Sequence, residues 1–185
     1  MILAILMVVA AGIFRLAAHG FHWWNIAPVG AMALLGGMCL GRRYALWVPL
    51  AVLAVTDMLL NVWMGYPMIY WPRAFDYSAF LLIGLLGLWT RDRKLGSKIG
   101  AVIATPFLFF LISNFAVWLF GPSLTNEPYA KTLSGLMDCY AAGLPFLRGT
   151  IIGDWGFMAL FAVSAVALRH ASGERSRCLA AEVRA

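Results

Sequence analysis

Ionisable residues placed within apolar stretches are the residues of this chain most able to do chemistry. Asp57 is followed one helical turn later by Asn61 on the same face, and Asp154 lies at the start of another apolar stretch. Arg15 and Arg148 are cations in or beside such stretches. A charge inside a membrane span is unfavourable unless it is paired or hydrated. These groups therefore either neutralise one another and hold the helices together, or bind a ligand or ion, and the sequence leaves both roles open.

A polar and aromatic segment, HGFHWWNIAP, follows the first apolar stretch. Its rings, Trp23 and Trp24, are typical of a loop at the level of the lipid headgroups, and Asn25 adds a group able to bind a ligand. His19 and His22 are three residues apart, a spacing that suits a metal ion. Because no third ligand lies nearby, we predict no metal site.

Two further places combine aromatic rings with polar groups. Trp71 and Arg73 lie in the loop before the fourth apolar stretch, where a ring and a cation suit a planar or heterocyclic ligand. Asn114 and Trp118 lie one turn apart in the fifth stretch. At that depth the Asn114 amide needs a hydrogen-bond partner, which either another helix or a ligand supplies.

No arrangement of residues points to catalysis or to a bound cofactor. The chain has no phosphate-binding G-x-x-x-x-G-K motif and no dinucleotide-binding G-x-G-x-x-G motif before a helix. Its three cysteines, Cys39, Cys139 and Cys178, lack C-x-x-C spacing. No serine or threonine has a histidine placed to activate it. We therefore predict no catalytic residues and no cofactor.

The composition is that of a membrane protein, with 63% hydrophobic and 12% charged residues and a mean hydropathy of +0.84. A soluble domain is usually about half apolar and about a quarter charged. Apolar stretches that reach or approach spanning length run over 1–18, 29–40, 44–63, 76–90, 99–120 and 150–168. The prediction is an all-α bundle of six transmembrane helices in one domain, 1–170, with a disordered cytoplasmic tail, 171–185.

One segment differs from the spans because its apolar residues follow a single helix face. Leu133, Leu136, Met137 and Tyr140 recur at helical spacing, and Pro145 is expected to end the helix. Polar residues occupy the other face, so the pattern predicts a short amphipathic helix on the outer side of the bundle.

The distribution of basic residues predicts the orientation. Ten of the 14 Lys and Arg residues lie between the second and third stretches, between the fourth and fifth, or after the sixth. The positive-inside rule places these regions and both termini in the cytoplasm, for a multi-pass protein of the bacterial inner membrane. This topology accounts for the net charge of +6, so we predict no nucleic-acid partner. Most acidic residues and tryptophans gather on the opposite side, which favours a ligand-binding mouth facing outward.

Small residues recur every fourth position in the second stretch, at Ala33, Gly37 and Gly41. Such a stripe lets another helix approach closely. The approaching helix belongs either to this bundle or to a partner membrane protein, and the pattern alone does not choose.

Four strings resemble a family of small bacterial membrane proteins of unassigned function. They are NIAPVGAMALLGG at 25–37, the pair Thr56–Asp57, NFAVW at 114–118 and CYAAGLPFLRGTIIGD at 139–154. That family is similar to the S components of energy-coupling-factor vitamin transporters, and the nearest of these is the solitary vitamin B12 component BtuM. The resemblance implies six helices, a vitamin or corrinoid pocket open to the outside, and an energising membrane module as a partner. BtuM is associated with a cobalt-ligating cysteine, and 76–80 reads DYSAF here, so a corrinoid would have to use His19, His22 or no protein ligand.

These observations give a leading hypothesis, a substrate-binding protein for uptake of a vitamin-sized small molecule, with the lipid bilayer and that molecule as partners. The alternatives are a membrane scaffold or assembly subunit and an intramembrane enzyme acting on a lipid or small ligand. The residues expected to line the ligand site are His22, Trp23, Trp24, Asn25, Asp57, Asn61, Trp71, Arg73, Asp76, Tyr77, Asn114, Trp118, Tyr140, Arg148 and Asp154.

Overall fold

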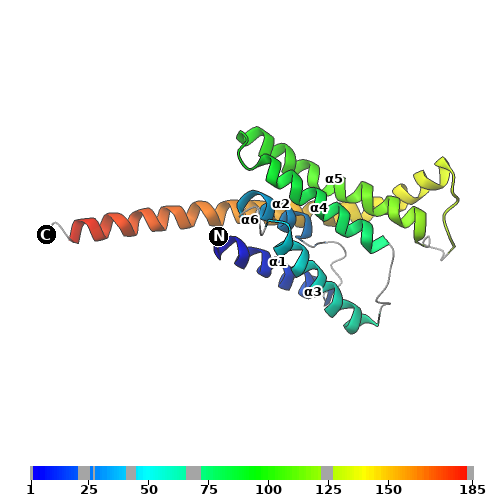
Figure 1. Cartoon of the computed structure of the whole chain (residues 1–185), viewed down its shortest axis with the longest axis horizontal. Helices are drawn as coiled ribbons and strands as arrows, with labels where there is room; N and C mark the ends of the chain where they lie inside the picture. Colours follow the sequence, from blue (N-terminus) through cyan, green and yellow to red (C-terminus); the bar gives the residue numbers. More distant parts are fainter. Residues whose placement is uncertain are drawn as a thin grey trace.

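The computed structural model describes residues 2–20, 26, 28–40, 45–65, 72–121 and 127–182. These residues form six helices and no strand, so the prediction of an all-α fold is confirmed (Figure 1). The helices are α1 (Ile2–Gly20), α2 (Val29–Cys39), α3 (Trp47–Met64), α4 (Pro72–Thr90), α5 (Leu95–Phe120) and α6 (Leu133–Glu182).

The last helix differs from the sequence prediction. We expected an amphipathic helix ended by Pro145 and a separate span over 150–168, but α6 continues through the proline as one helix of 50 residues. A proline removes one backbone hydrogen bond, and a long helix in an apolar setting tolerates that loss when neighbouring groups compensate. The segment 171–182, expected to be disordered, is helical too, and it projects well beyond the other helices (Figure 1). Its alanine, arginine, glutamate and leucine residues are good helix formers.

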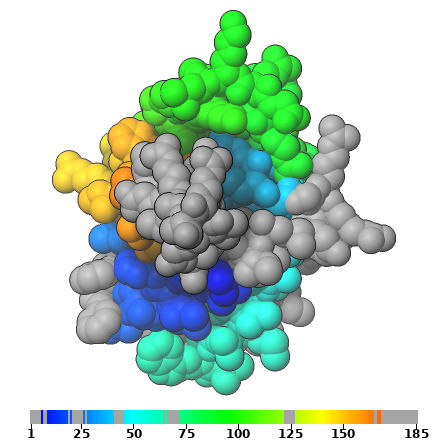
Figure 2. Space-filling model, turned by 90° about the vertical axis from the view of Figure 1, so that its left-hand side faces the viewer, coloured from blue at the N-terminus to red at the C-terminus, as the bar shows by residue number. Residues whose placement is uncertain are grey.

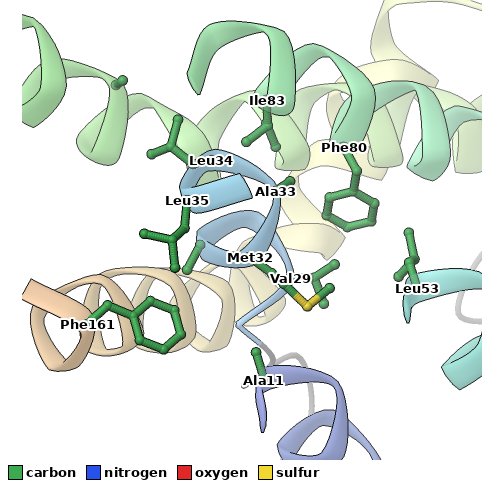
Figure 3. Packing of buried hydrophobic residues seen from close by; sticks show 12 residues of the cluster. Ala11, Val29, Met32, Ala33, Leu34, Leu35, Leu53, Phe80, Ile83 and Phe161 are labelled. Carbon is green, nitrogen blue, oxygen red and sulfur yellow. The ribbon is translucent and has the colours of Figure 1, made fainter. Parts of the chain in front are cut away.

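Helix α2 is the centre of the bundle. It has only 11 residues, every residue from Val29 to Gly37 is buried, and it packs against each of the other five helices. Figure 3 shows Met32 and Leu34 of this helix among apolar side chains of its neighbours, including Phe80 and Phe161. In an end-on view, α4 and α5 lie on one side of the molecule and α1 and α3 on the opposite side (Figure 2). The remaining helices are therefore arranged around a short buried one.

Close backbone contact holds α2 against α4. A Cβ atom added at Gly37 would collide with the Gly84 carbonyl oxygen and would lie 2.7 Å from the Gly87 Cα atom. Gly87 in turn packs against the Leu34 carbonyl. The small-residue stripe of α2 thus serves packing inside this chain as far as Gly37, and Gly41 lies outside the described residues.

Helix α5 runs antiparallel to both α4 and α6, since Tyr140 and Trp155 of α6 bind the Leu111 and Val102 carbonyls of α5. Phe75 and Phe80 of α4 face Phe120 and Phe109 of α5, with ring centroids 5.7 and 4.9 Å apart. Helices α2 and α4 run in the same direction, since Ala33 lies beside Gly84 and Gly37 beside Gly87.

The carboxyl end of α2 is bound by an arginine from the segment after α4. The Arg91 guanidinium donates hydrogen bonds to the Gly37 carbonyl at 2.7 Å and to the Leu40 carbonyl. The last carbonyls of a helix lack partners within it and carry partial negative charge, so a cation stabilises them. Arg91 therefore satisfies groups that would otherwise be buried without partners.

The outward surfaces of the helices are strongly apolar. Leu95, Ile99, Ile103, Phe107, Leu111 and Phe115 recur every fourth residue along α5, and each is 38–71% exposed. At 1.5 Å per residue this stripe is about 30 Å long, which is about the thickness of the hydrocarbon core of a bilayer. Two helices, Leu95–Phe120 and the Leu133–Ser164 part of α6, are long and apolar enough to cross a membrane.

Replacing Gly37 by alanine tests the contact between α2 and α4. We expect Gly37→Ala to lower the free energy of unfolding by about 1–3 kcal/mol, because the new methyl group overlaps backbone that cannot move aside easily. Gly156→Ala is the matched control, since a Cβ atom there meets nothing within 4 Å. That control should be neutral or stabilising by up to about 1 kcal/mol. Equal behaviour of the two variants on chemical unfolding in mild detergent would contradict the packing described.

Replacing Arg91 tests the capping of α2. Arg91→Gln should lower the free energy of unfolding by about 1.5–3 kcal/mol, because charge-assisted hydrogen bonds to buried carbonyls are lost. Arg93→Gln is the control, since the Arg93 guanidinium is exposed and lies over the Trp89 ring at 4.5 Å. Removal of the Arg93 guanidinium should lower the free energy of unfolding by no more than about 1 kcal/mol. A larger effect at Arg93 than at Arg91 would contradict this assignment.

Candidate ligand-binding site

All six helices contribute side chains to one cavity of about 230 Å³. Its lining residues are Arg15 of α1, Val29 and Gly30 of α2, Leu53 and Asp57 of α3, Arg73, Asp76 and Phe80 of α4, Phe109 of α5, and Thr150 and Asp154 of α6. Arg73 and Asp76 lie in the first turns of α4, whereas Arg91 follows its last turn. The cavity therefore lies toward the end of the bundle opposite the basic segment that begins at Arg91.

An ion pair between α1 and α3 forms one wall of the cavity. The Arg15 guanidinium lies 2.5 Å from the Asp57 carboxylate, and the two side chains are only 21% and 12% exposed. Arg15 also donates a hydrogen bond to the Thr56 hydroxyl at 2.7 Å, and Thr56 is buried. These contacts satisfy charges that would be costly to leave alone in an apolar bundle.

Helix α4 adds a second set of contacts to the same carboxylate. The Tyr77 hydroxyl donates to an Asp57 oxygen at 2.9 Å, and the Arg73 Nε atom lies 3.8 Å from that oxygen. Arg73 also donates to the buried Asn61 side-chain oxygen at 2.9 Å. Asp57 is thus the centre of a polar network that joins α1, α3 and α4.

Asp154 occupies a different position, beside the start of α2. One of its carboxylate oxygens accepts a hydrogen bond from the Ala31 backbone N–H at 2.9 Å. The residue before α2 is Pro28, whose side chain caps nothing, so the carboxylate of α6 serves as the cap. An anion at a helix N-terminus is also favoured by the helix dipole.

The second oxygen of Asp154 has no hydrogen-bond partner among the described residues, although Asp154 is only 1% exposed. Gly30 makes this approach of the carboxylate to α2 feasible, because a Cβ atom at Gly30 would collide with that oxygen and with Thr105. Buried carboxylate oxygens in native proteins are nearly always hydrogen-bonded. The free oxygen therefore needs an explanation.

The cavity also has an apolar wall. The rings of Phe80 and Phe109 are stacked, with centroids 4.9 Å apart and planes at 19°, and Val29 and Leu53 complete the surface. Charged groups on one side and aromatic carbon on the other suit a small amphipathic molecule. Among the described residues no group of three His, Cys, Asp or Glu side chains is placed to hold a metal ion.

Comparison with known proteins gives a family. The sequence profile named Family of unknown function (DUF6580) matches residues 1–175. The chain belongs to this family. No curated protein and no solved structure matches the chain.

In this DUF6580 protein, the cavity brings together four of the residues expected at the site, Asp57, Arg73, Asp76 and Asp154. Two others, Asn61 and Tyr77, bind these charged groups rather than line the cavity. Five expected residues lie outside the described residues: His22, Trp23, Trp24, Asn25 and Trp71.

The remaining expected residues lie elsewhere in this DUF6580 protein. Asn114, Trp118 and Tyr140 each donate a hydrogen bond to a backbone carbonyl, of Phe110, Ala130 and Leu111 respectively. The Trp118 and Tyr140 bonds tie α5 to α6 and to the segment before it. Arg148 is exposed and does not line the cavity. Of the four charged groups that were expected to neutralise one another, Arg15 and Asp57 form an ion pair.

Sequence reasoning missed the apolar wall of the cavity. Phe80 lies one turn after Asp76 on the same face of α4, and that spacing was the available signal. Phe109 and Leu53 carried no signal, because an apolar residue in an apolar stretch looks the same whether it faces a cavity or lipid. Gly30 was part of a string that resembles the family, yet its role depends on Asp154, which is far away in sequence.

A double-mutant cycle tests the ion pair of this DUF6580 protein. Arg15→Leu and Asp57→Leu each leave the other charge without its closest partner. Each substitution should therefore lower the free energy of unfolding by about 3–5 kcal/mol. The destabilisation of the double variant should be smaller than the sum of the two single destabilisations by about 0.5–3 kcal/mol. A control cycle of Asp57→Leu with Arg148→Leu should be additive within about 0.5 kcal/mol. Additivity in the first cycle, measured by unfolding in mild detergent, would exclude direct pairing.

Proposed function

We propose that this protein is a multi-pass protein of the bacterial inner membrane that binds a vitamin-sized small molecule for uptake, in the manner of an S component. The observation that carries the proposal is the cavity that all six helices line, with charged or aromatic side chains from every helix except α2. The chain has no nucleotide-binding motif of its own, so energy for uptake would come from a partner module or an ion gradient.

The outward apolar surface supports membrane insertion. Only 17% of the most apolar part of α5 and 28% of that of α6 are buried within the protein. A core helix of a soluble protein would be mostly buried, and a signal sequence would lie near the N-terminus, so neither explanation fits these two helices. A continuous exposed apolar stripe of bilayer length is favourable in lipid and unfavourable in water.

The alternating direction of α4, α5 and α6 supports six crossings. Arg91, Arg93, Lys94 and Lys98 cluster between α4 and α5, at the end of the bundle away from the cavity. If this end faces the cytoplasm, the cavity lies toward the outside, where an uptake protein meets its substrate. Helix α2 is too short to span on its own, at about 16 Å, so it would cross within the protection of its neighbours.

The size of the cavity favours a small ligand. About 230 Å³ is below the usual range for drug-sized ligands, and it is smaller than a corrinoid. We therefore propose a one- or two-ring molecule rather than a corrinoid. The scaffold alternative loses its motivating surface, because Gly37 is engaged with α4.

Mass spectrometry of the protein purified in mild detergent tests this function. We expect one small molecule to co-purify in stoichiometric amount. Asp76→Leu should lose most of it, because Asp76 lines the cavity and makes no hydrogen bond to another described residue. Arg148→Leu, an exposed site away from the cavity, is the control and should retain the molecule. Recovery of lipid alone from the unaltered protein would count against uptake.

A further inference from the structure

We propose that the ligand of the cavity is an organic cation whose N–H groups bind the carboxylates of Asp154 and Asp76. This inference rests on the proposed function, because it names the chemical class of the molecule that the cavity takes. Four observations support it, concerning charge, hydrogen bonding, the aromatic wall and the volume of the cavity.

The described residues that line the cavity include more carboxyl than guanidinium groups. Arg15 and Arg73 face three carboxylates, those of Asp57, Asp76 and Asp154. Both guanidinium groups lie within ion-pair distance of Asp57, at 2.5 and 3.8 Å. Neither lies within that distance of Asp76, which they attract only at longer range. Among the described residues that line the cavity, carboxyl groups therefore outnumber guanidinium groups by three to two, and a cationic ligand would stabilise the charged form of the two carboxyl groups outside the Asp57 ion pairs.

The two remaining carboxylates have capacity to accept hydrogen bonds. The free oxygen of Asp154 is buried, and no described residue donates to it. Asp76 likewise accepts no hydrogen bond from a described residue, and it lines the same cavity from α4. A ligand ammonium, amidinium or similar group would donate to both, and such charge-assisted bonds are short and strong. This would supply the partner that the buried oxygen lacks.

The rest of the cavity fits an organic cation better than an inorganic one. The stacked rings of Phe80 and Phe109 offer aromatic surface to a flat ligand, and a cation over such a ring is attracted to it. Among the described residues the carboxylates do not form a cluster able to hold a metal ion. The volume of about 230 Å³ corresponds to about eight water molecules, which is ample for one or two rings and far more than a bare ion needs.

Three probes of equal size and different charge test this inference: benzamidine, which is a cation, benzamide, which is neutral, and benzoate, which is an anion. Binding to the protein in mild detergent is measured by calorimetry. We expect benzamidine to bind at least about tenfold more tightly than benzamide, and benzoate not to bind, because only the cation satisfies the carboxylates. Equal binding of benzamide or preference for benzoate would overturn the inference.

Two conservative variants locate the binding. Asp154→Asn retains an oxygen for the Ala31 N–H but removes the charge, and should weaken benzamidine binding about tenfold. Asp76→Asn should weaken benzamidine binding to a similar extent. Because Asp76 does not cap α2, this variant still tests the inference if Asp154→Asn fails to fold. Arg148→Gln should bind as the unaltered protein does. Unchanged affinity in a folded Asp154→Asn and in Asp76→Asn would overturn the inference.

The two proposals can fail separately. A stoichiometric co-purifying molecule that is neutral or anionic would overturn the cation inference and leave the uptake function in place. If no probe binds, the cation inference is overturned, and co-purification of lipid alone would then remove the uptake function as well.

Discussion

The structure depends on the burial of one short helix, α2, whose ends must be satisfied within the protein. A helix leaves its first N–H groups and its last carbonyls without partners, and water cannot reach them when the helix is surrounded on all sides. Here an aspartate from α6 binds the first turn and an arginine after α4 binds the last carbonyls. The signs of these charges match the helix dipole, so each group stabilises the end at which it lies. Burial of α2 thus fixes where α4 and α6 must be.

Close packing around α2 follows from the same constraint. Glycine at 37 and 87 lets the backbones of α2 and α4 touch, and glycine at 30 leaves room for the Asp154 carboxylate. Without those glycines the charged groups would not reach the helix ends that they bind. Small residues and ionisable residues in this chain are therefore parts of one arrangement, in which close approach makes the electrostatic contacts feasible.

The cavity lies beside a carboxylate whose hydrogen bonds the described residues supply only in part. Asp57 has cationic and hydroxyl partners from α1 and α4, whereas Asp154 uses only one oxygen on the protein. A buried acceptor without a donor is a cost to the fold unless a ligand or another group supplies the donor. The cavity thus combines charged groups, one of them with an unsatisfied buried oxygen, with helices whose outer surface is apolar.

The sequence by itself determined the helical class, because long apolar stretches interrupted by polar loops form helices in an environment without water. It also marked Asp57 and Asp154 as unusual, since a charge in such a stretch needs a reason, and it included Arg73 and Asp76 among the residues expected at a ligand site. It predicted neither the continuous α6 nor the helical segment 171–182, because proline is a local signal and the surrounding helix overrides it. The pairing of Arg15 with Asp57, the capping of α2 and the inclusion of Phe80 and Phe109 in the cavity were decided only by tertiary structure. These contacts join residues far apart in the chain, and no local spacing specifies which helix face meets which.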